Sequence, residues 1–274
     1  MRVLNFAPIF SLIITLLTVT ATHANVKYTD QQKLHSIVKH VSSKNIKKDI
    51  ETLVSFGTRH TLSETKSKTR GIGAARRWIK SEFEKISKEC NNCLDVYFQK
   101  ETISGEKRIP EPTEVVSVIA VLKGKADPER YVIMTGDIDS RVSDPMNATS
   151  DSPGANDNAS GIAGVLETAR VLTKYEFNGS IVFAALAGEE QGLFGGKIMA
   201  KQAQKEGWRI KAVLNNDMIG NIQGVNGVIN NTTARIFAEG TRQTETPKQA
   251  KQRRFTGGEV DSPTRNLARY IDWM

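Results

Sequence analysis

The chain has 274 residues, of which 39% are hydrophobic and 25% charged, and its formal net charge is +8. This apolar fraction excludes a disordered chain, and the lack of a glycine period excludes a collagen-like one. The length allows one large domain or two small ones, and we find no internal repeat that would indicate a solenoid or a propeller. Acidic and basic residues are interspersed, so we expect no nucleic-acid partner.

The first 24 residues have the pattern of an export signal. Arg2 supplies a positive charge, an apolar stretch runs from Phe6 to Val19, and Thr22-His23-Ala24 ends in small residues typical of a cleavage site. The apolar stretch is too short and too interrupted for a transmembrane span. We therefore expect a secreted or periplasmic protein without a stable membrane anchor.

Cys90 and Cys93, the two cysteines of the chain, form a C-x-x-C pair after an amphipathic segment. In a cytosolic protein this spacing would suggest redox chemistry or half of a zinc site. No further zinc ligands follow it, and no thioredoxin-like pattern surrounds it. In an exported protein the pair predicts a local structural disulfide.

Apolar periodicity predicts helices first and then an alternation of strands and helices. Residues 29–87 have helical spacing, and the chain from 94 onward alternates, which predicts an α/β fold on a layered sheet. The predicted strands are 94–99, 114–122, 131–134, 180–186 and 210–214, with weaker candidates at 225–229 and 234–238. The predicted later helices are 162–172 and 196–205, and residues 240–258 are predicted to form a polar, basic connection.

The end of the chain carries a helix start without a helix end. Ser262-Pro263 is a good start, with a capping hydroxyl followed by proline, but no glycine cap precedes Met274. We therefore divide the chain into a signal peptide (1–24), a helical region leading into the first strand (25–110), and a catalytic region that we expect to be incomplete at its C-terminus (111–274).

Acidic residues follow three of the predicted strands and precede one helix. Ligand sites in open α/β sheets lie outside the carboxyl ends of the strands, and carboxylates that converge there need cations to neutralise them. A single such motif is commonly a helix cap or a solvated charge, whereas four in one segment predict a site for a pair of divalent metal ions. The residues are Asp137 and Asp139 in TGDIDS, Asp157 in PGANDNASG, Glu189 and Glu190 in AGEEQG, and Asp217 in NNDMIG.

These four motifs, in this order between about Val132 and Asn221, resemble the co-catalytic di-zinc aminopeptidase family, which includes bacterial leucyl aminopeptidases and related glutamate carboxypeptidases. The resemblance implies an α/β/α sandwich on a mixed, mainly parallel sheet. It also implies an exported metal-dependent aminopeptidase that hydrolyses N-terminal residues of peptides through a metal-activated water.

The resemblance assigns a role to each matching carboxylate. Asp157 matches the carboxylate that bridges both metals, Asp217 matches a ligand of the first metal, and Glu190 matches a ligand of the second. Glu189 matches the general base, and Asp139 matches a carboxylate that orients a histidine ligand. Members of the family often have a cis peptide bond after the bridging aspartate, so we expect one there.

Two positions depart from the family pattern. Asp137 aligns with the first histidine ligand; aspartate can ligate zinc, but it shifts the preference toward Mn²⁺, Co²⁺ or Mg²⁺. The family's last ligand is a histidine near the C-terminus, whereas the histidines here, His23, His35, His40 and His60, all precede the metal motifs. We expect two divalent ions, zinc first among them, and a chain with little activity unless sequence beyond residue 274 supplies the histidine.

Other functions remain open at this point. One is a non-catalytic relative that binds metal or peptide, which the absent histidine favours. Another is carboxypeptidase or glutaminyl-cyclase chemistry on the same site. The sequence predicts neither the preferred N-terminal residue nor the oligomeric state.

Overall fold

The structure is a computed structural model that describes residues 32, 34–242 and 244–273, so the predicted export signal lies outside the described residues. The chain divides into two compact units, residues up to Met218 and residues from Ile219 onward. The helices and strands of the first unit are α2 (Ser43–Ser55), α3 (Gly71–Glu89), β1 (Leu94–Ile103), β2 (Thr113–Leu122), β3 (Asp127–Asp137), the distorted helical segment η1 (Ala155–Ser160), α4 (Gly161–Leu172), β4 (Gly179–Leu186), α5 (Phe194–Lys205) and β5 (Arg209–Asn215). The second unit contains α6 (Pro247–Phe255) and α7 (Pro263–Trp273).

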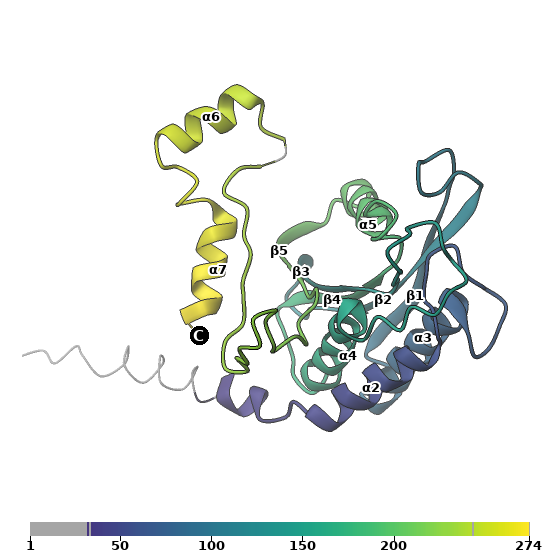
Figure 1. Ribbon diagram of the computed structural model, residues 1–274. Coiled ribbons are helices and arrows are strands. Elements are labelled where there is room, and N and C mark those ends of the chain that lie inside the picture. The colour runs from purple at the N-terminus through teal and green to yellow at the C-terminus, as the bar shows by residue number, and fades with distance from the viewer. Residues whose placement is uncertain (1–31, 33, 243, 274) are drawn as a thin grey trace, which may run out of the picture. The chain divides into compact units, whose positions relative to one another are not determined.

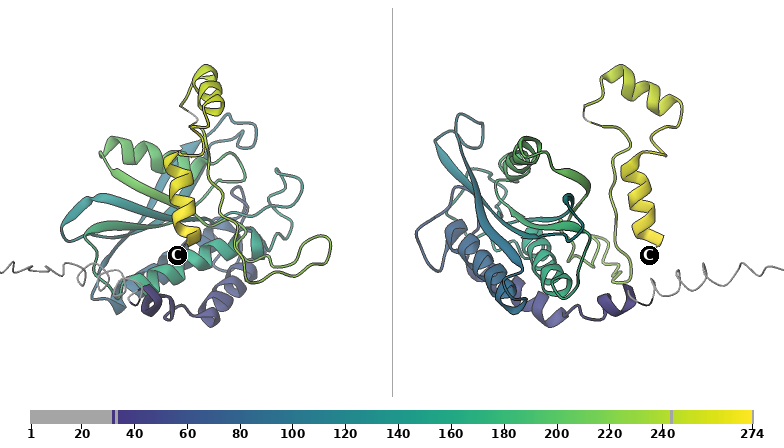
Figure 2. Two further views of the ribbon diagram at one scale, coloured as in Figure 1. Left: turned by 90° about the vertical axis from the view of Figure 1, so that its left-hand side faces the viewer. Right: turned by 180° about the vertical axis from the view of Figure 1, so that it is seen from behind.

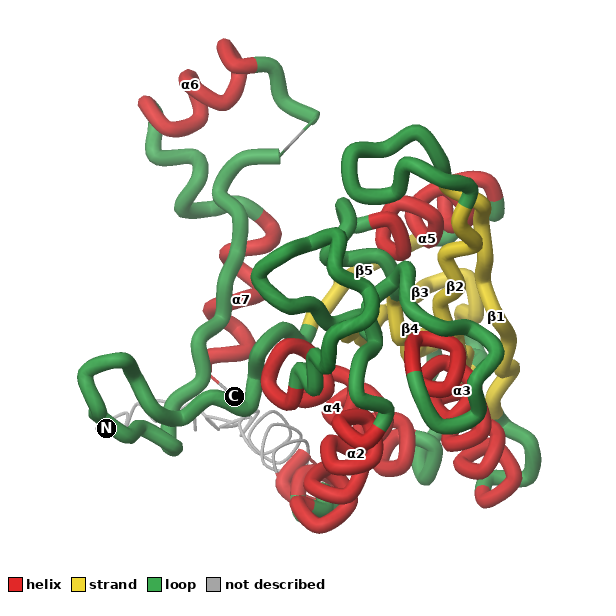
Figure 3. The backbone as a smooth tube through the Cα atoms, turned by 45° about the vertical axis from the view of Figure 1, so that its right-hand side comes forward, coloured by secondary structure: helices red, strands yellow, loops and turns green. Residues whose placement is uncertain are grey.

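The first unit is built on a five-stranded mixed sheet in the order β1-β2-β4-β3-β5. β1 pairs antiparallel with β2, and β2 antiparallel with β4, whereas β3 runs parallel to both β4 and β5. The helices α2, α3 and α4 lie on one side of the sheet and α5 on the other (Figures 1 and 2; Figure 3 draws the strands yellow). The predicted α/β/α sandwich on a mixed sheet is confirmed.

Burial on both faces explains why the central strands are continuous apolar runs. The neighbours Val182 and Phe183 on β4 point to opposite faces, and both are fully buried. Phe183 packs in the core cluster that contains Phe83 of α3 and Leu166 of α4, whereas Val182 packs with Met199 of α5. A strand covered on both faces loses the alternation of apolar and polar residues that marks a half-exposed one.

A buried ionic network fixes the three helices on one side to one another. Arg170 of α4 bonds Asp49 of α2 at 2.6 Å, Glu82 of α3 at 3.1 Å and Glu167 of its own helix at 3.3 Å. Asp49 and Glu167 are 3% exposed, so their charges depend on this guanidinium for compensation. The network contains none of the predicted site residues.

The predicted N-terminal helical region differs from the structure between α2 and α3. Residues 56–70 are not helical, because α2 ends at Ser55 and Gly57 follows with a φ of +70°, in the left-handed region. The segment instead crosses to the loop after β3, where Thr58 forms an isolated bridge with Ser152. The prediction of continuous helical character over 29–87 was wrong here. β1, before residue 110, pairs with β2, after it, over ten residue pairs, so strands from both regions belong to one sheet.

Two features of the second unit differ from the predictions. The weak strand candidates 225–229 and 234–238 are not strands; the first contributes only an isolated bridge between Gln223 and Ile229. The predicted polar connection 240–258 contains the helix α6, which Thr246 opens with a capping box to Gln249. None of its residues is buried, so it lacks the apolar stripe by which helices are recognised.

Two local predictions agree with the structure. Cys90 and Cys93 are joined by a disulfide with their Cα atoms 5.4 Å apart. The helix α7 begins at Pro263, and the Ser262 hydroxyl accepts a hydrogen bond from the Arg265 N–H at 3.3 Å, as a capping residue does. No helix in the described ranges is long and apolar enough to cross a bilayer.

Candidate active site

The parallel strands β3, β4 and β5 bring three acidic segments to one edge of the sheet. Asp137 is the last residue of β3 and is paired with Leu186, the last residue of β4. Glu189 follows β4 by three residues, and Asp217 follows β5 by two. Parallel neighbours end at the same edge, so these carboxylates lie in one region although they are 80 residues apart between Asp137 and Asp217.

The pKa values of these carboxylates record their proximity. The pKa of Asp137 rises to about 8, first because the side chain is buried and then because Asp139, Glu189 and Asp217 carry like charges nearby. The pKa of Glu189 rises to about 7 through burial and through Asp139, Glu190, Asp217 and Asp157. The cluster therefore holds more negative charge than its surroundings neutralise.

The distorted segment η1 brings Asp157 to the same cluster. Asp157 is exposed. The pKa of Asp217 is raised first by the burial of Asp217 itself and then by the negative charge of Asp157. The peptide bond Asp157-Asn158 is cis, as predicted. The buried Asn158 side chain donates to Asp137 Oδ2 at 3.2 Å and to the Asn216 carbonyl at 2.8 Å. One amide thus connects the segment η1 with the ends of β3 and β5.

Asp139 holds the backbone of the two neighbouring glutamates. It is 1% exposed, and its two oxygens accept hydrogen bonds from the Glu189 N–H at 3.2 Å and the Glu190 N–H at 3.0 Å. The Thr61 hydroxyl donates to Oδ2 at 3.1 Å. The resemblance predicts that Asp139 orients a metal ligand; in the structure it orients the loop that carries Glu189.

Glu190 has a cationic partner in the structure. Its carboxylate forms an ion pair with Arg141. Burial raises the pKa of Glu190, and the Arg141 guanidinium partly opposes this rise. Within the described residues, no three His, Cys, Asp or Glu side chains form a group that could hold a metal ion. The roles of Asp137, Asp157, Glu190 and Asp217 as ligands therefore remain predictions.

The chemistry of the cluster nevertheless fits divalent cations. Its side chains are oxygen donors, and the pKa values of Asp137, Glu189, Glu190 and Asp217 are all raised by burial and by neighbouring acids. Hard, anionic oxygen donors suit divalent ions, and bound cations reverse the repulsion that raises these pKa values.

His60 does not offer a ring nitrogen to a metal. The residue is fully buried, and its Nδ1 accepts a hydrogen bond from the Leu62 N–H at 3.1 Å. The proton is therefore on Nε2, which donates to the Pro145 carbonyl at 2.9 Å. His35 and His40 are exposed near the start of the described residues.

The sequence interpretation missed Arg59, Thr61 and Arg141 near the cluster, and it named Asn158 only for the cis peptide bond and not for its side-chain contacts. Two of them belong to the segment GTRHT, in which only His60 was considered. The one feature of this segment that could have indicated a buried role is Arg59, an arginine with no amphipathic pattern around it. Asn158 and Arg141 each follow a singled-out aspartate by one or two residues.

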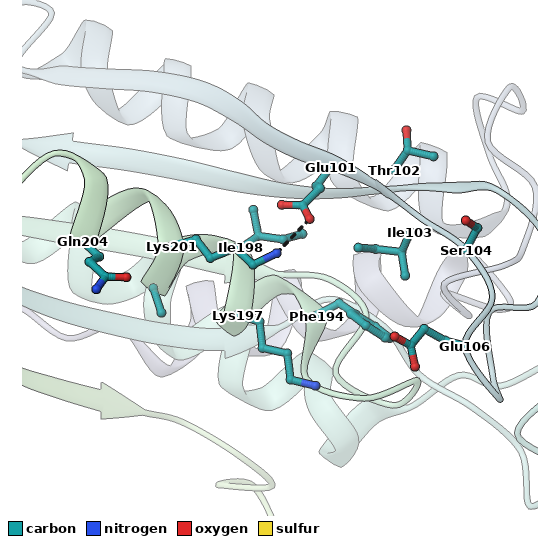
Figure 4. A pocket seen from close by; sticks show the side chains of 11 residues that line it. Glu101, Thr102, Ile103, Ser104, Glu106, Phe194, Lys197, Ile198, Lys201 and Gln204 are labelled. Atoms are coloured by element: carbon teal, nitrogen blue, oxygen red, sulfur yellow. Dashed lines mark hydrogen bonds and ion pairs between the residues drawn. The ribbon is translucent and has the colours of Figure 1, made fainter. Parts of the chain in front are cut away.

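A pocket of about 620 Å³ lies between the end of β1 and α5 (Figure 4). Phe194 and Ile198 form its apolar wall, and Lys201 pairs with Glu101 across it at 3.0 Å. None of the predicted site residues lines this pocket.

Comparisons with known proteins identify the family. A probable zinc metalloprotease of Pyrenophora teres f. teres is 45% identical over 240 residues, which are 87% of this chain and 50% of that protein. The structure is similar to LapB of Legionella pneumophila (TM-score 0.54, 26% identity, 70% of this chain and 48% of that one) and to the Legionella pneumophila LapA aminopeptidase (TM-score 0.51, 26% identity, 67% and 44%). The chain spans about half the length of the curated relatives that it matches. The profile described as peptidase family M28 matches residues 117–262, more than half of the chain. The chain therefore belongs to peptidase family M28.

Proposed function

We propose that this protein is an exported, zinc-dependent aminopeptidase that removes N-terminal residues from peptides. The observation that carries the proposal is the convergence of acidic residues from four segments at one edge of the sheet, with Glu189 among them. The family membership and the similarity to the Legionella pneumophila LapA aminopeptidase support the reaction class.

The resemblance to the di-zinc aminopeptidase family implies the ligand set. Asp157 would bridge two ions, Asp137 and Asp217 would complete the first site, and Glu190 would belong to the second. Glu190 would exchange its contact with Arg141 for the metal. Once ionised, the carboxylates of the cluster outnumber the guanidinium groups of Arg59 and Arg141, and divalent ions would offset the excess negative charge.

Glu189 is the proposed general base. Burial and neighbouring acids raise its pKa to about 7 in the metal-free chain, which places the carboxylate inside the acidic cluster. A carboxylate in this position could take a proton from water and return it later to the leaving amine. Bound zinc would supply Lewis acidity toward the scissile carbonyl and toward water. Asp139 fixes the N–H groups of Glu189 and Glu190, so the base begins from a backbone whose position is set.

Export is part of the proposal. The N-terminal pattern of charge, apolar stretch and small residues supports it, and so does the Cys90–Cys93 disulfide, since disulfides persist in oxidising compartments. Fusion of residues 1–30 to a reporter lacking its own signal tests this point through the location of the reporter.

The full-length protein should release the N-terminal residue from aminoacyl p-nitroanilides and should not act on the same substrates with a blocked amine. Glu189→Gln should keep zinc, measured by elemental analysis, while turnover falls by about 10²–10⁴-fold. Glu190→Gln is the matched variant and should lose zinc. Equal zinc loss in both variants would refute the assigned roles, and zinc-free turnover by the wild type would refute the function.

A further inference from the structure

We propose that Arg59 is a positioning residue that sets the spacing between Asp137, at the end of β3, and the loop of Asp157. This inference rests on the proposed function, because the two carboxylates matter as a pair only if they share metal ions. Arg59 lies in the non-helical segment between α2 and α3, outside the residues matched by the M28 profile.

The Arg59 guanidinium is fully buried and is bonded to backbone carbonyls of three different segments. Nε donates to the Ile138 carbonyl at 2.8 Å, and Ile138 stands between the two aspartates of GDIDS. Nη1 donates to the Pro153 carbonyl at 2.7 Å and to the Leu53 carbonyl at 3.1 Å. Nη2 donates to the Gly154 carbonyl at 2.9 Å. One rigid, planar group therefore joins the end of β3, the end of α2 and the start of the loop before Asp157.

The Gly154 carbonyl connects this contact with the loop of Asp157. The same oxygen accepts a hydrogen bond from the Ala159 N–H at 3.0 Å, which closes the loop of residues 154–159. Gly154 has a φ of +49°, and a Cβ added there would lie 2.3 Å from the Asp157 carbonyl oxygen and 2.8 Å from Arg59 Nη2. The loop is thus packed directly against the guanidinium.

Arginine has the shape and the charge that this place requires. Its five N–H groups form a rigid fork, whereas a lysine ammonium has three donors at one point and would leave some of the four carbonyls without a partner. Burial lowers the pKa of Arg59 to about 10, opposed by the charges of Asp139 and Asp157, so the group stays positive at neutral pH. Its charge offsets the acidic cluster while its contacts are with backbone, which leaves the carboxylates available to metal.

A general contribution to stability would also explain a buried arginine, so the test must separate positioning from stability. Arg170 provides the matched control. It is a second, largely buried arginine with several hydrogen-bonded partners, and none of them belongs to the acidic cluster. Arg170→Lys should lower the free energy of unfolding and leave the zinc affinity unchanged.

The experiment measures the zinc Kd of the full-length protein by competition with a chromophoric chelator, together with urea unfolding. Arg59→Lys should raise the Kd about 10–100-fold, as expected when a residue that orients metal ligands is changed. Gly154→Ala, which displaces the same loop and keeps the guanidinium, should also raise it. The visible spectrum of the Co²⁺-loaded protein should change in both variants and not in Arg170→Lys.

A wild-type Kd in Arg59→Lys overturns the inference; if that variant does not fold, a wild-type Kd in Gly154→Ala overturns it. Equal loss of zinc affinity in Arg59→Lys and Arg170→Lys also overturns it, because stability would then explain both. The proposed function fails separately, if the wild type binds zinc but hydrolyses no peptide.

Discussion

Asp139→Asn would remove a carboxylate oxygen from the backbone of the proposed catalytic loop. In the folded chain Oδ1 accepts from the Glu189 N–H, and Oδ2 accepts from the Glu190 N–H and the Thr61 hydroxyl. An asparagine amide has a single oxygen, so its NH₂ group must face one of the two N–H groups. The Thr61 hydroxyl can reverse and accept, but a backbone N–H cannot.

One buried N–H therefore loses its acceptor whichever way the asparagine amide is turned. Leaving a buried donor unsatisfied costs about 1–3 kcal/mol, and Asp139 is 1% exposed, so water does not replace the acceptor. The lost acceptor should lower the free energy of unfolding of the metal-free protein by about 1–3 kcal/mol, and the relief of like-charge repulsion on Asp137 and Glu189 opposes this loss. The measurement is urea unfolding followed by circular dichroism.

Asp151→Asn is the matched control, since that carboxylate pairs with Arg70 at the surface with 73% of its side chain exposed. Its effect should stay within about 0.5 kcal/mol. If Asp139→Asn is as stable as Asp151→Asn, the two backbone hydrogen bonds do not hold the loop and the reasoning fails.

Three further predictions concern other groups of the chain. The metal-free protein should lose stability as pH rises from about 4 to about 8, because the pKa values of Asp137 and Glu189 are raised in the folded state. In this range the folded state binds protons that the unfolded chain has released. Thermal unfolding at several pH values measures this, and stability that rises through the range would contradict it. Arg170→Met should destabilise the protein by about 3–5 kcal/mol, because it strands the buried carboxylates that this guanidinium bonds; urea unfolding measures the loss, and a change under about 1 kcal/mol would contradict it. Cys90 and Cys93 should resist alkylation in the native exported protein until a reductant is added, and mass spectrometry showing two alkylated thiols without reductant would refute the bridge.

The sheet and the acidic edge could be predicted from the sequence because both follow from simple regularities. A buried strand such as β4 is a short apolar run between turn residues, so local sequence alone predicts it without reference to distant residues. Once β3, β4 and β5 are recognised as parallel, the positions directly after them must meet at one edge. Asp137, Glu189 and Asp217 could therefore be placed together although they are far apart in the chain.

The helix α6 and the segment between α2 and α3 could not be predicted in the same way. The helix α6 has no buried residue, so only its Thr246 capping box distinguishes it from a charged loop. Most of the segment from Gly57 to Ser63 is buried, but its residues are mostly polar and make contacts in several directions. Neither has the periodicity that reveals an element packed on one face.

The acidic cluster raises a further question, which is where the compensating charge comes from. The carboxylates of the site can be recognised in the sequence because they directly follow predicted strands. Their excess negative charge predicts cations nearby, but it does not say whether these are metal ions or basic side chains. A metal ion and a buried arginine both answer this requirement. Arg59 is hidden from pattern reading because its partners are the carbonyls of Leu53, Ile138, Pro153 and Gly154, and every residue has a carbonyl. The sequence does show the arginine itself. In a segment without an amphipathic pattern, no polar face is predicted that would carry its guanidinium into solvent. In a chain with unneutralised acids, such an arginine is the first residue to examine as a support of the metal site, before any lone histidine.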